Sequence, residues 1–216
     1  MRTPQRMLAW AISASAVASI SMMMLSSWPN FVHVYASPRN SAAEPHRRNP
    51  DPPCFDNDNR YVNCANGTVT DTHTGLIWLQ DAGCLGSLTW AEANQAAAGL
   101  ENGQCGLADG SKAGDWRLPS NAEWLAMVDA ARNHPQLQCR NPALTDDSGS
   151  NCFGDGSRSS FMNVTFDGYW SSTTNSQSSG LRPDGTKAGT MPLSAGFLLS
   201  FFSKNVAQPV WPVRTR

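Results

Sequence analysis

Two segments of the chain carry the signals that start a helix. Residues 89–92 (TWAE) and 120–123 (SNAE) are capping boxes, in which the hydroxyl and the glutamate bind backbone N–H groups of the first turn. An alanine-rich stretch that ends at glycine follows the first box, and Trp124, Leu125 and Val128 follow the second at helical spacing. The pattern therefore predicts two helices.

Short apolar runs between turn residues predict β-strands. A hairpin is expected from residues 67–71 and 76–79, joined by a turn at Thr74 and Gly75. Further strands are expected at 169–174 (YWSSTT), 196–203 and 209–214. Long loops, rich in Ser, Asp, Asn and Gly, are expected at 139–163 and 175–192. Helices combined with scattered short strands indicate an α+β fold.

The N-terminus has the pattern of an export signal. Arg2 and Arg6 precede an uncharged run over residues 7–25, and small residues lead to a cleavage signature that ends at Ala36. We expect cleavage there, which makes residues 1–36 a signal peptide and leaves no membrane span. The alternative is a retained anchor, because the uncharged run is long enough to cross a bilayer.

The rest of the chain divides into a linker and one domain. Residues 37–53 hold five prolines, which favour a linker, and the domain is expected at 54–216. The predicted leader contains two of the 16 basic residues and none of the 17 acidic residues. The mature protein is therefore mildly acidic, which disfavours nucleic acid and anionic membranes as partners.

The six cysteines agree with export. All of them lie beyond Ala36, and an even number in an exported chain indicates disulfides. Zinc is the alternative, but no Cys-x-x-Cys spacing occurs. Pairing between neighbours in the sequence is favoured among the arrangements that remain open: Cys54 with Cys64, Cys84 with Cys105, and Cys139 with Cys152.

Several segments, taken in order, resemble one bacterial domain family. They are 67–84 (GTVTDTHTGLIWLQDAGC), 89–93 (TWAEA), 103–124 (GQCGLADGSKAGDWRLPSNAEW), 169–174 (YWSSTT) and 210–214 (VWPVR). In order and spacing they are similar to the C-terminal domain of Legionella collagen-like protein. The resemblance covers the chain from about residue 60 to its end.

The resemblance implies a C-type-lectin-like fold, in which two helices flank a small twisted antiparallel sheet and long loops form the ligand surface. It also implies adhesion or extracellular recognition, with sulfated glycans as the ligand of the founding member. No catalytic motif comes with the family. This chain departs from the pattern in its loop at 139–163, in the run at 196–202 and in its acidic charge.

The most distinctive local motif is Asp115-Trp116-Arg117-Leu118-Pro119, followed by Glu123. Asp115 and Arg117 are suited to gripping a polar ligand. The favoured interpretation is structural, with Arg117 satisfying Asp115, Glu123 or nearby carbonyl groups beside buried tryptophans.

Tyr169 and Trp170 form a candidate ligand surface. Aromatic faces stack on sugar rings, although a half-buried strand shows the same alternation. Calcium is disfavoured, because Arg182-Pro183-Asp184 is the nearest match to a calcium-dependent sugar triplet and has a cation in place of an acceptor. The acidic loops at 56–58 and 146–147 are expected to be solvated turns.

The sequence gives little support for an enzymatic function. The domain has only His73 and His134 as histidines, and no serine-nucleophile, zinc-hydrolase or phosphate-binding motif occurs. We therefore expect no catalytic residue, no metal and no cofactor. The predicted function is an extracytoplasmic, adhesin-like module for a glycan or a cell-surface protein. The alternatives are a relative of the formylglycine-generating enzymes, inactive or not, and a periplasmic assembly protein.

Overall fold

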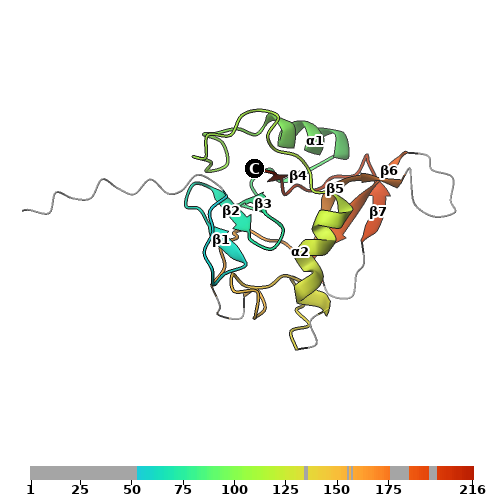
Figure 1. Cartoon of the computed structure of the whole chain (residues 1–216). Helices are drawn as coiled ribbons and strands as arrows, with labels where there is room; N and C mark the ends of the chain where they lie inside the picture. The colour runs from blue at the N-terminus through green and yellow to red at the C-terminus, as the bar shows by residue number, and fades with distance from the viewer. Residues whose placement is uncertain (1–52, 134–135, 155, 157, 176–184, 195–198) are drawn as a thin grey trace, which may run out of the picture. The chain divides into compact units, whose positions relative to one another are not determined.

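A computed structural model describes residues 53–133, 136–154, 156, 158–175, 185–194 and 199–216 (Figure 1). The predicted leader and residues 37–52 of the predicted linker lie outside the described residues, so the signal peptide, its cleavage and the alternative of an anchor stay predictions. Within the described part of the chain, no helix combines the length and apolar character that crossing a membrane requires.

Both predicted helices form, at α1 (Trp90–Gly99) and α2 (Asn121–Asn133). The Glu92 carboxylate accepts the backbone N–H of Thr89 at 3.0 Å. At the second helix, Glu123 Oε2 accepts the N–H of Ser120 at 2.7 Å. One detail of the prediction is wrong: Leu125 does not lie on the buried face of α2, since 49% of its surface is exposed. The buried face of α2 consists of Trp124, Met127, Val128 and Ala131.

The predicted hairpin forms the middle of a four-stranded antiparallel sheet. Its strands are β2 (Thr68–Asp71) and β3 (Leu76–Leu79), joined through Gly75 at φ 71°. The sheet order is β1-β2-β3-β9, with β1 at Tyr61–Asn63 and β9 at Val213–Arg214. Every residue of β3 is buried, and this strand pairs with β2 on one side and with the C-terminal strand β9 on the other.

A second antiparallel sheet has the order β5-β6-β7. Its strands are β5 (Gly168–Thr174), β6 (Lys187–Pro192) and β7 (Ser200–Ser203). The strand predicted at 169–174 is thus confirmed, and residues 200–203 of the strand predicted at 196–203 form β7. Residues 196–198 lie outside the described residues. The prediction of a loop over all of 175–192 is wrong, because β6 pairs with both of its neighbours.

The strand predicted at 209–214 is in fact two. β8 (Gln208–Pro209) pairs with β4 (Ser87–Leu88), whereas β9 joins the first sheet. Between them, Trp211 turns into the core and its indole N–H donates to the Leu79 carbonyl at 2.8 Å. The buried Trp211 thus lies between the two strands.

An aromatic core holds the two sheets and α2 together. Trp124 of α2 lies 5.1 Å from the ring of Trp78 on β3 and 5.6 Å from the ring of Tyr169 on β5. Trp211 contacts all three of these rings. In Figure 1, α2 accordingly runs between the hairpin strands and the β5–β6–β7 sheet. The architecture is α+β, as predicted.

The structure joins the cysteines as the sequence favoured: Cys54 to Cys64, Cys84 to Cys105, and Cys139 to Cys152. None of the six remains free. The last bond closes the long loop within 139–163, whose described residues form no helix or strand. They form two isolated bridges, Thr145 to Cys152 within the loop and Met162 to Asp81 outside it.

Candidate functional site

Arg117 binds the first turn of α2. Its guanidinium donates to both carboxylate oxygens of Glu123, at 2.8 and 2.6 Å, and to the Leu118 carbonyl at 3.2 Å. Asp115, the other carboxylate offered by the motif, instead accepts the backbone N–H of Lys112 at 2.7 Å. Arg117 and Asp115 therefore do not form a clamp around one ligand position.

The Glu123 carboxyl is held in its charged form. Burial alone would raise its pKa, but hydrogen bonds from Arg117 and Ser120 and the guanidinium charge lower the pKa to about 2. The hydrogen bonds to Glu123 and the charge of its carboxylate raise the pKa of Arg117. This pair ties the strand-like segment before α2 to the first turn of the helix.

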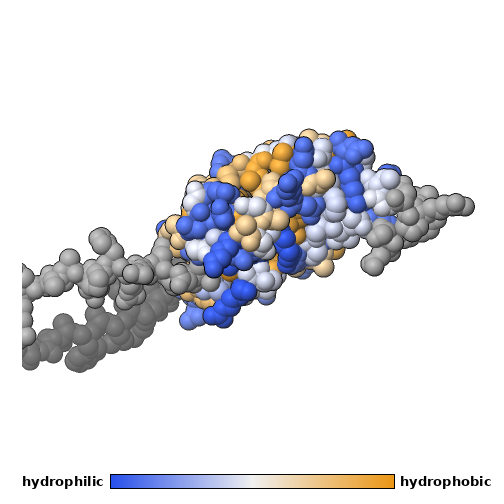
Figure 2. Space-filling model, turned by 90° about the horizontal axis from the view of Figure 1, so that it is seen from above, coloured by the Kyte–Doolittle hydropathy of each residue, from blue (hydrophilic) through white to orange (hydrophobic). Residues whose placement is uncertain are grey.

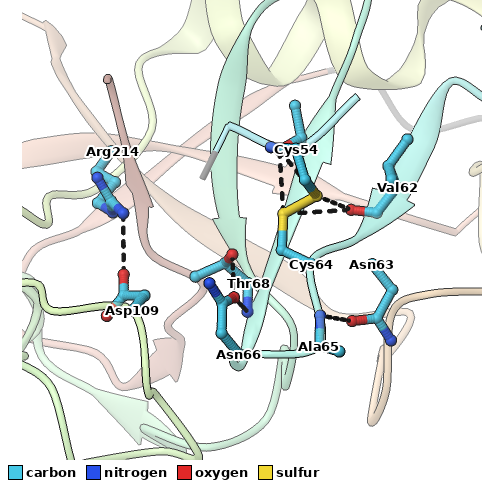
Figure 3. The surroundings of a disulfide bond; sticks show 10 residues. Cys54, Val62, Asn63, Cys64, Ala65, Asn66, Thr68, Asp109 and Arg214 are labelled. Atoms are coloured by element: carbon cyan, nitrogen blue, oxygen red, sulfur yellow. Dashed lines mark hydrogen bonds and ion pairs between the residues drawn. A yellow bond between two sulfur atoms is a disulfide. The ribbon is translucent and has the colours of Figure 1, made fainter. Parts of the chain in front are cut away.

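The rest of this motif is joined to the C-terminal strand. Trp116 is 1% exposed, and the Arg214 guanidinium lies 5.5 Å from the centre of its ring. Arg214 also donates to Asp109 at 3.0 Å, a contact drawn in Figure 3 beside the Cys54–Cys64 disulfide. Arg117 and Val213 exchange two backbone hydrogen bonds of 2.9 Å. The segments 103–124 and 210–214 therefore form one structural unit.

The prediction that Tyr169 and Trp170 form a ligand surface is wrong. Both are 0% exposed. Successive side chains of a strand point to opposite faces, and both faces of β5 are covered here. Tyr169 packs in the aromatic core, whereas Trp170 packs with Ala93 and Ala97 of α1. Their polar atoms are occupied: the Tyr169 hydroxyl accepts the Thr165 N–H at 2.9 Å, and the Trp170 indole donates to the Leu88 carbonyl at 2.8 Å.

The open aromatic side chains lie beside β5, not on it. Phe166 precedes the strand and is 52% exposed, and Phe202 on β7 is 46% exposed. Together they line a groove of about 240 Å³, which we call the Phe groove. The remaining residues of its lining are small or polar: Asp167, Gly168, Thr190, Pro192, Ser194, Ser200 and Gln208.

The floor of the Phe groove depends on a glycine. A Cβ atom added at Gly168 would lie 3.3 Å from both Cβ and Oγ1 of Thr190, and 3.7 Å from Oε1 of Gln208. A side chain at this position would therefore crowd Thr190 and Gln208, two other residues of the lining. Sequence reasoning did not single out Phe166, Gly168 or Phe202; the weak signal was a phenylalanine between polar residues in both TFDG (165–168) and SFFS (200–203).

Phe166 also lines a second depression, of about 590 Å³, beside the Cys139–Cys152 disulfide. Its other wall includes Arg140, Pro142 and Phe153. Phe166 therefore stands between two hollows of the surface. On the face seen in Figure 2, apolar residues form small patches among hydrophilic ones.

A third depression, of about 410 Å³, lies over α2 and contains His73. Arg60 forms its base, but this guanidinium is already paired with Asp71 at 3.3 Å in a buried ion pair. No serine or cysteine is among the described residues of this lining, and its one hydroxyl group, that of Thr74, accepts the backbone N–H of Leu76 at 3.3 Å. His134 lies outside the described residues.

The two acidic loops differ. The loop at 56–58 is an exposed turn, as expected, in which Asp56 accepts the backbone N–H groups of Asp58 and Asn59. The expectation of a solvated turn at 146–147 is wrong, because Asp146 and Asp147 are 4% and 7% exposed. The Asp147 carboxylate accepts the N–H and the hydroxyl of Ser160, which ties two distant parts of the loop together. No group of three or more His, Cys, Asp or Glu side chains suited to a metal ion occurs in the described part of the chain. The segment Arg182-Pro183-Asp184 lies outside it.

Comparison with known proteins gives one match. The family model described as Lcl C-terminal domain matches residues 67–214. No curated protein matches the chain, and no solved structure does.

Proposed function

Because the chain belongs to the Lcl C-terminal domain family, we propose that it is an exported recognition module, adhesin-like, that binds a glycan or another surface ligand in the Phe groove. The proposal includes a C-type-lectin-like fold, with which two helices and small antiparallel sheets agree. The three disulfides support a working place outside the cytoplasm, where thiols oxidise.

The observation that carries the proposal is that two exposed phenylalanines, Phe166 and Phe202, line one groove whose other lining residues are mostly polar or small. A concave site with apolar walls and a few polar groups is the usual form of a small-ligand site. The other large aromatic side chains of β5 and α2 are buried, so the two exposed rings are exceptional in this part of the molecule.

The enzymatic alternative lacks the residues that its chemistry requires. A formylglycine-type enzyme needs a reactive cysteine pair, whereas each of the six cysteines here is bonded to another. A reactive thiolate is also accessible and has a lowered pKa. The proposed function is therefore binding without catalysis and without a cofactor.

The test is binding of the mature protein, residues 37–216, to an array of neutral, carboxylated and sulfated glycans, in calcium and again in chelator. We expect binding to at least one class, and we expect it to be lost in both Phe166→Ala and Phe202→Ala. Phe55→Ala is the matched control, because Phe55 is 59% exposed and lines none of the three depressions.

Two results would overturn the proposal. If folded, thiol-free protein binds no glycan class on the array, a glycan ligand is excluded and protein partners become the alternative. Binding that survives both groove substitutions would place the ligand elsewhere on the molecule.

A further inference from the structure

We infer that the Phe groove takes one uncharged pyranose ring of a saccharide, without calcium and without sulfate recognition. The inference rests on the proposed function and specifies its ligand. It follows from the size, the walls, the floor and the charge of the groove.

The size of the groove fits a single ring. Its volume of about 240 Å³ is below the roughly 300–1,000 Å³ of sites that enclose drug-sized ligands. A longer oligosaccharide would place one ring in the groove and extend over the surface beyond it. The neighbouring depression, which shares Phe166, offers a path for such an extension.

The walls suit the apolar face of a sugar. A pyranose ring has a face of C–H groups, which pack against the π-face of an aromatic ring. Phe166 and Phe202 come from different segments, one before β5 and one on β7, and each has about half of its surface open. A ligand between them would bury apolar area that is now in water, which is favourable.

The floor and rim suit the hydroxyl groups of a sugar. Gln208 offers an amide with two donors and an acceptor, and Ser194 adds a hydroxyl group. Gly168 allows Thr190 and its hydroxyl to lie close to β5, since an added Cβ would be 3.3 Å from that hydroxyl. Apolar walls over a floor of hydroxyl and amide groups match the amphipathic surface of a pyranose better than that of an aliphatic ligand.

The charge of the groove disfavours anionic sugars. Among the described residues of its lining, Asp167 is the only ionisable one. Sulfate and carboxylate groups are bound in proteins by arginine and lysine. Three of the described arginines are already paired with carboxylates elsewhere: Arg60, Arg117 and Arg214. A sulfated chain would meet the negative charge of Asp167 without a cation in the lining to offset it.

Calcium is not required by this geometry. Protein calcium sites use about six to eight oxygen ligands, several of them carboxylates. The described lining of the Phe groove supplies one carboxylate, that of Asp167.

The experiment is a calorimetric titration of the mature protein with cellotetraose, chitotetraose and mannotetraose as neutral probes, and with heparin as the sulfated probe. We expect at least one neutral probe to bind, with an affinity unchanged by chelator and by salt. Phe166→Ala and Phe202→Ala should each weaken it about tenfold or more, because each removes a large apolar contact. Gln208→Ala should weaken it too, whereas Phe55→Ala should change it less than twofold.

The outcomes separate the ligand class from the proposed function. Heparin binding that falls with salt and depends on Phe166 and Phe202 would overturn the neutral ligand and leave the Phe groove as the site. Loss of neutral binding in chelator would overturn the calcium-free site alone. Neutral binding unaffected by the groove substitutions would contradict both. Insensitivity to Gln208→Ala would overturn the role given to this amide in binding the sugar hydroxyl groups.

Discussion

The family motif and the Phe groove differ in where their side chains lie. The motif residues Trp116, Trp170 and Arg214 are held in contacts within the protein. The Trp170 indole and the Arg214 guanidinium each bind another part of the chain. Phe166 and Phe202 lie outside the motif segments and about half open to solvent. The family motif therefore specifies the folded framework of the domain. The proposed binding surface consists of residues from the chain between the motif segments.

The two kinds of aromatic residue illustrate this division. Tryptophan is buried here in two ways. The indole N–H groups of Trp170 and Trp211 donate to backbone carbonyl groups, as buried indoles usually do. Those of Trp78 and Trp116 have no hydrogen-bond partner in the described structure, and these two rings are held by packing alone. Phenylalanine has no polar group and would be expected inside. Its exposure at two positions of one groove is therefore the more informative observation.

The largest effect on the free energy of unfolding should come from removing an aromatic side chain of the core. Trp170→Ala is expected to lower the free energy of unfolding by about 3–5 kcal/mol, since it leaves a cavity between β5 and α1. Phe202→Ala should change it by no more than about 0.5 kcal/mol, as exposed substitutions do. Denaturant unfolding of both variants measures the contrast. Similar losses in the two would show that the groove residues are structural.

A somewhat smaller loss of unfolding free energy is expected when the buried ion pair between the motif and the C-terminal strand is broken. Asp109 has no exposed side-chain surface, and Arg214 depends on it. Asp109→Asn should therefore cost roughly 3 kcal/mol in unfolding free energy, because it leaves a largely buried cation without its partner. Asp115→Asn is the matched control, since Asp115 is exposed and makes no contact with an arginine in the described structure. Equal effects of the two substitutions would refute the role given to Asp109.

The smallest effect should come from the half-exposed pair at the start of α2, and it depends on pH. The folded-state pKa of Glu123 is lowered from 4.5 to about 2, so its contribution is present above pH 4.5 and is lost as pH falls toward 2. At neutral pH, Glu123→Gln should cost about 1 kcal/mol, because solvent screens a pair in which Arg117 is 43% exposed. The difference from the unsubstituted protein should shrink below pH 4.

Unfolding curves of the Glu123→Gln variant and the unsubstituted protein, measured over this pH range, show whether their stability difference shrinks or grows as pH falls. Glu101→Gln, at an exposed glutamate whose side chain makes no hydrogen bond in the described residues, is the control. A difference that grows as pH falls would contradict the assignment of the Glu123 pKa.

How much the sequence predicts depends on the range of the interactions. The capping boxes and the turn at Gly75 are local, so the helix starts and the hairpin follow from neighbouring residues. β6 was missed because Lys187–Pro192 contains glycine and proline and is held by pairing with β5 and β7. The break near Trp211 likewise depends on a distant partner, Leu79.

The candidate site was the least predictable part. Phe166, Thr190 and Gln208 come from separate segments, and only the folded arrangement brings them to one groove. The aromatic pair that the sequence favoured, Tyr169 and Trp170, adjoins the groove in the chain but faces inward on both sides of β5. Alternation along a strand indicates two faces without showing whether a second layer covers the polar one.

The most direct test of the central claim is amide chemical-shift mapping of the isotope-labelled mature protein, titrated with a saccharide that it binds. If the Phe groove is the site, the largest shifts should fall at Phe166, Gly168 and Phe202, with Asp109 and Arg214 unchanged. Shifts concentrated at Asp109, Arg117 and Arg214 would contradict the account, because the motif itself would then be the binding surface.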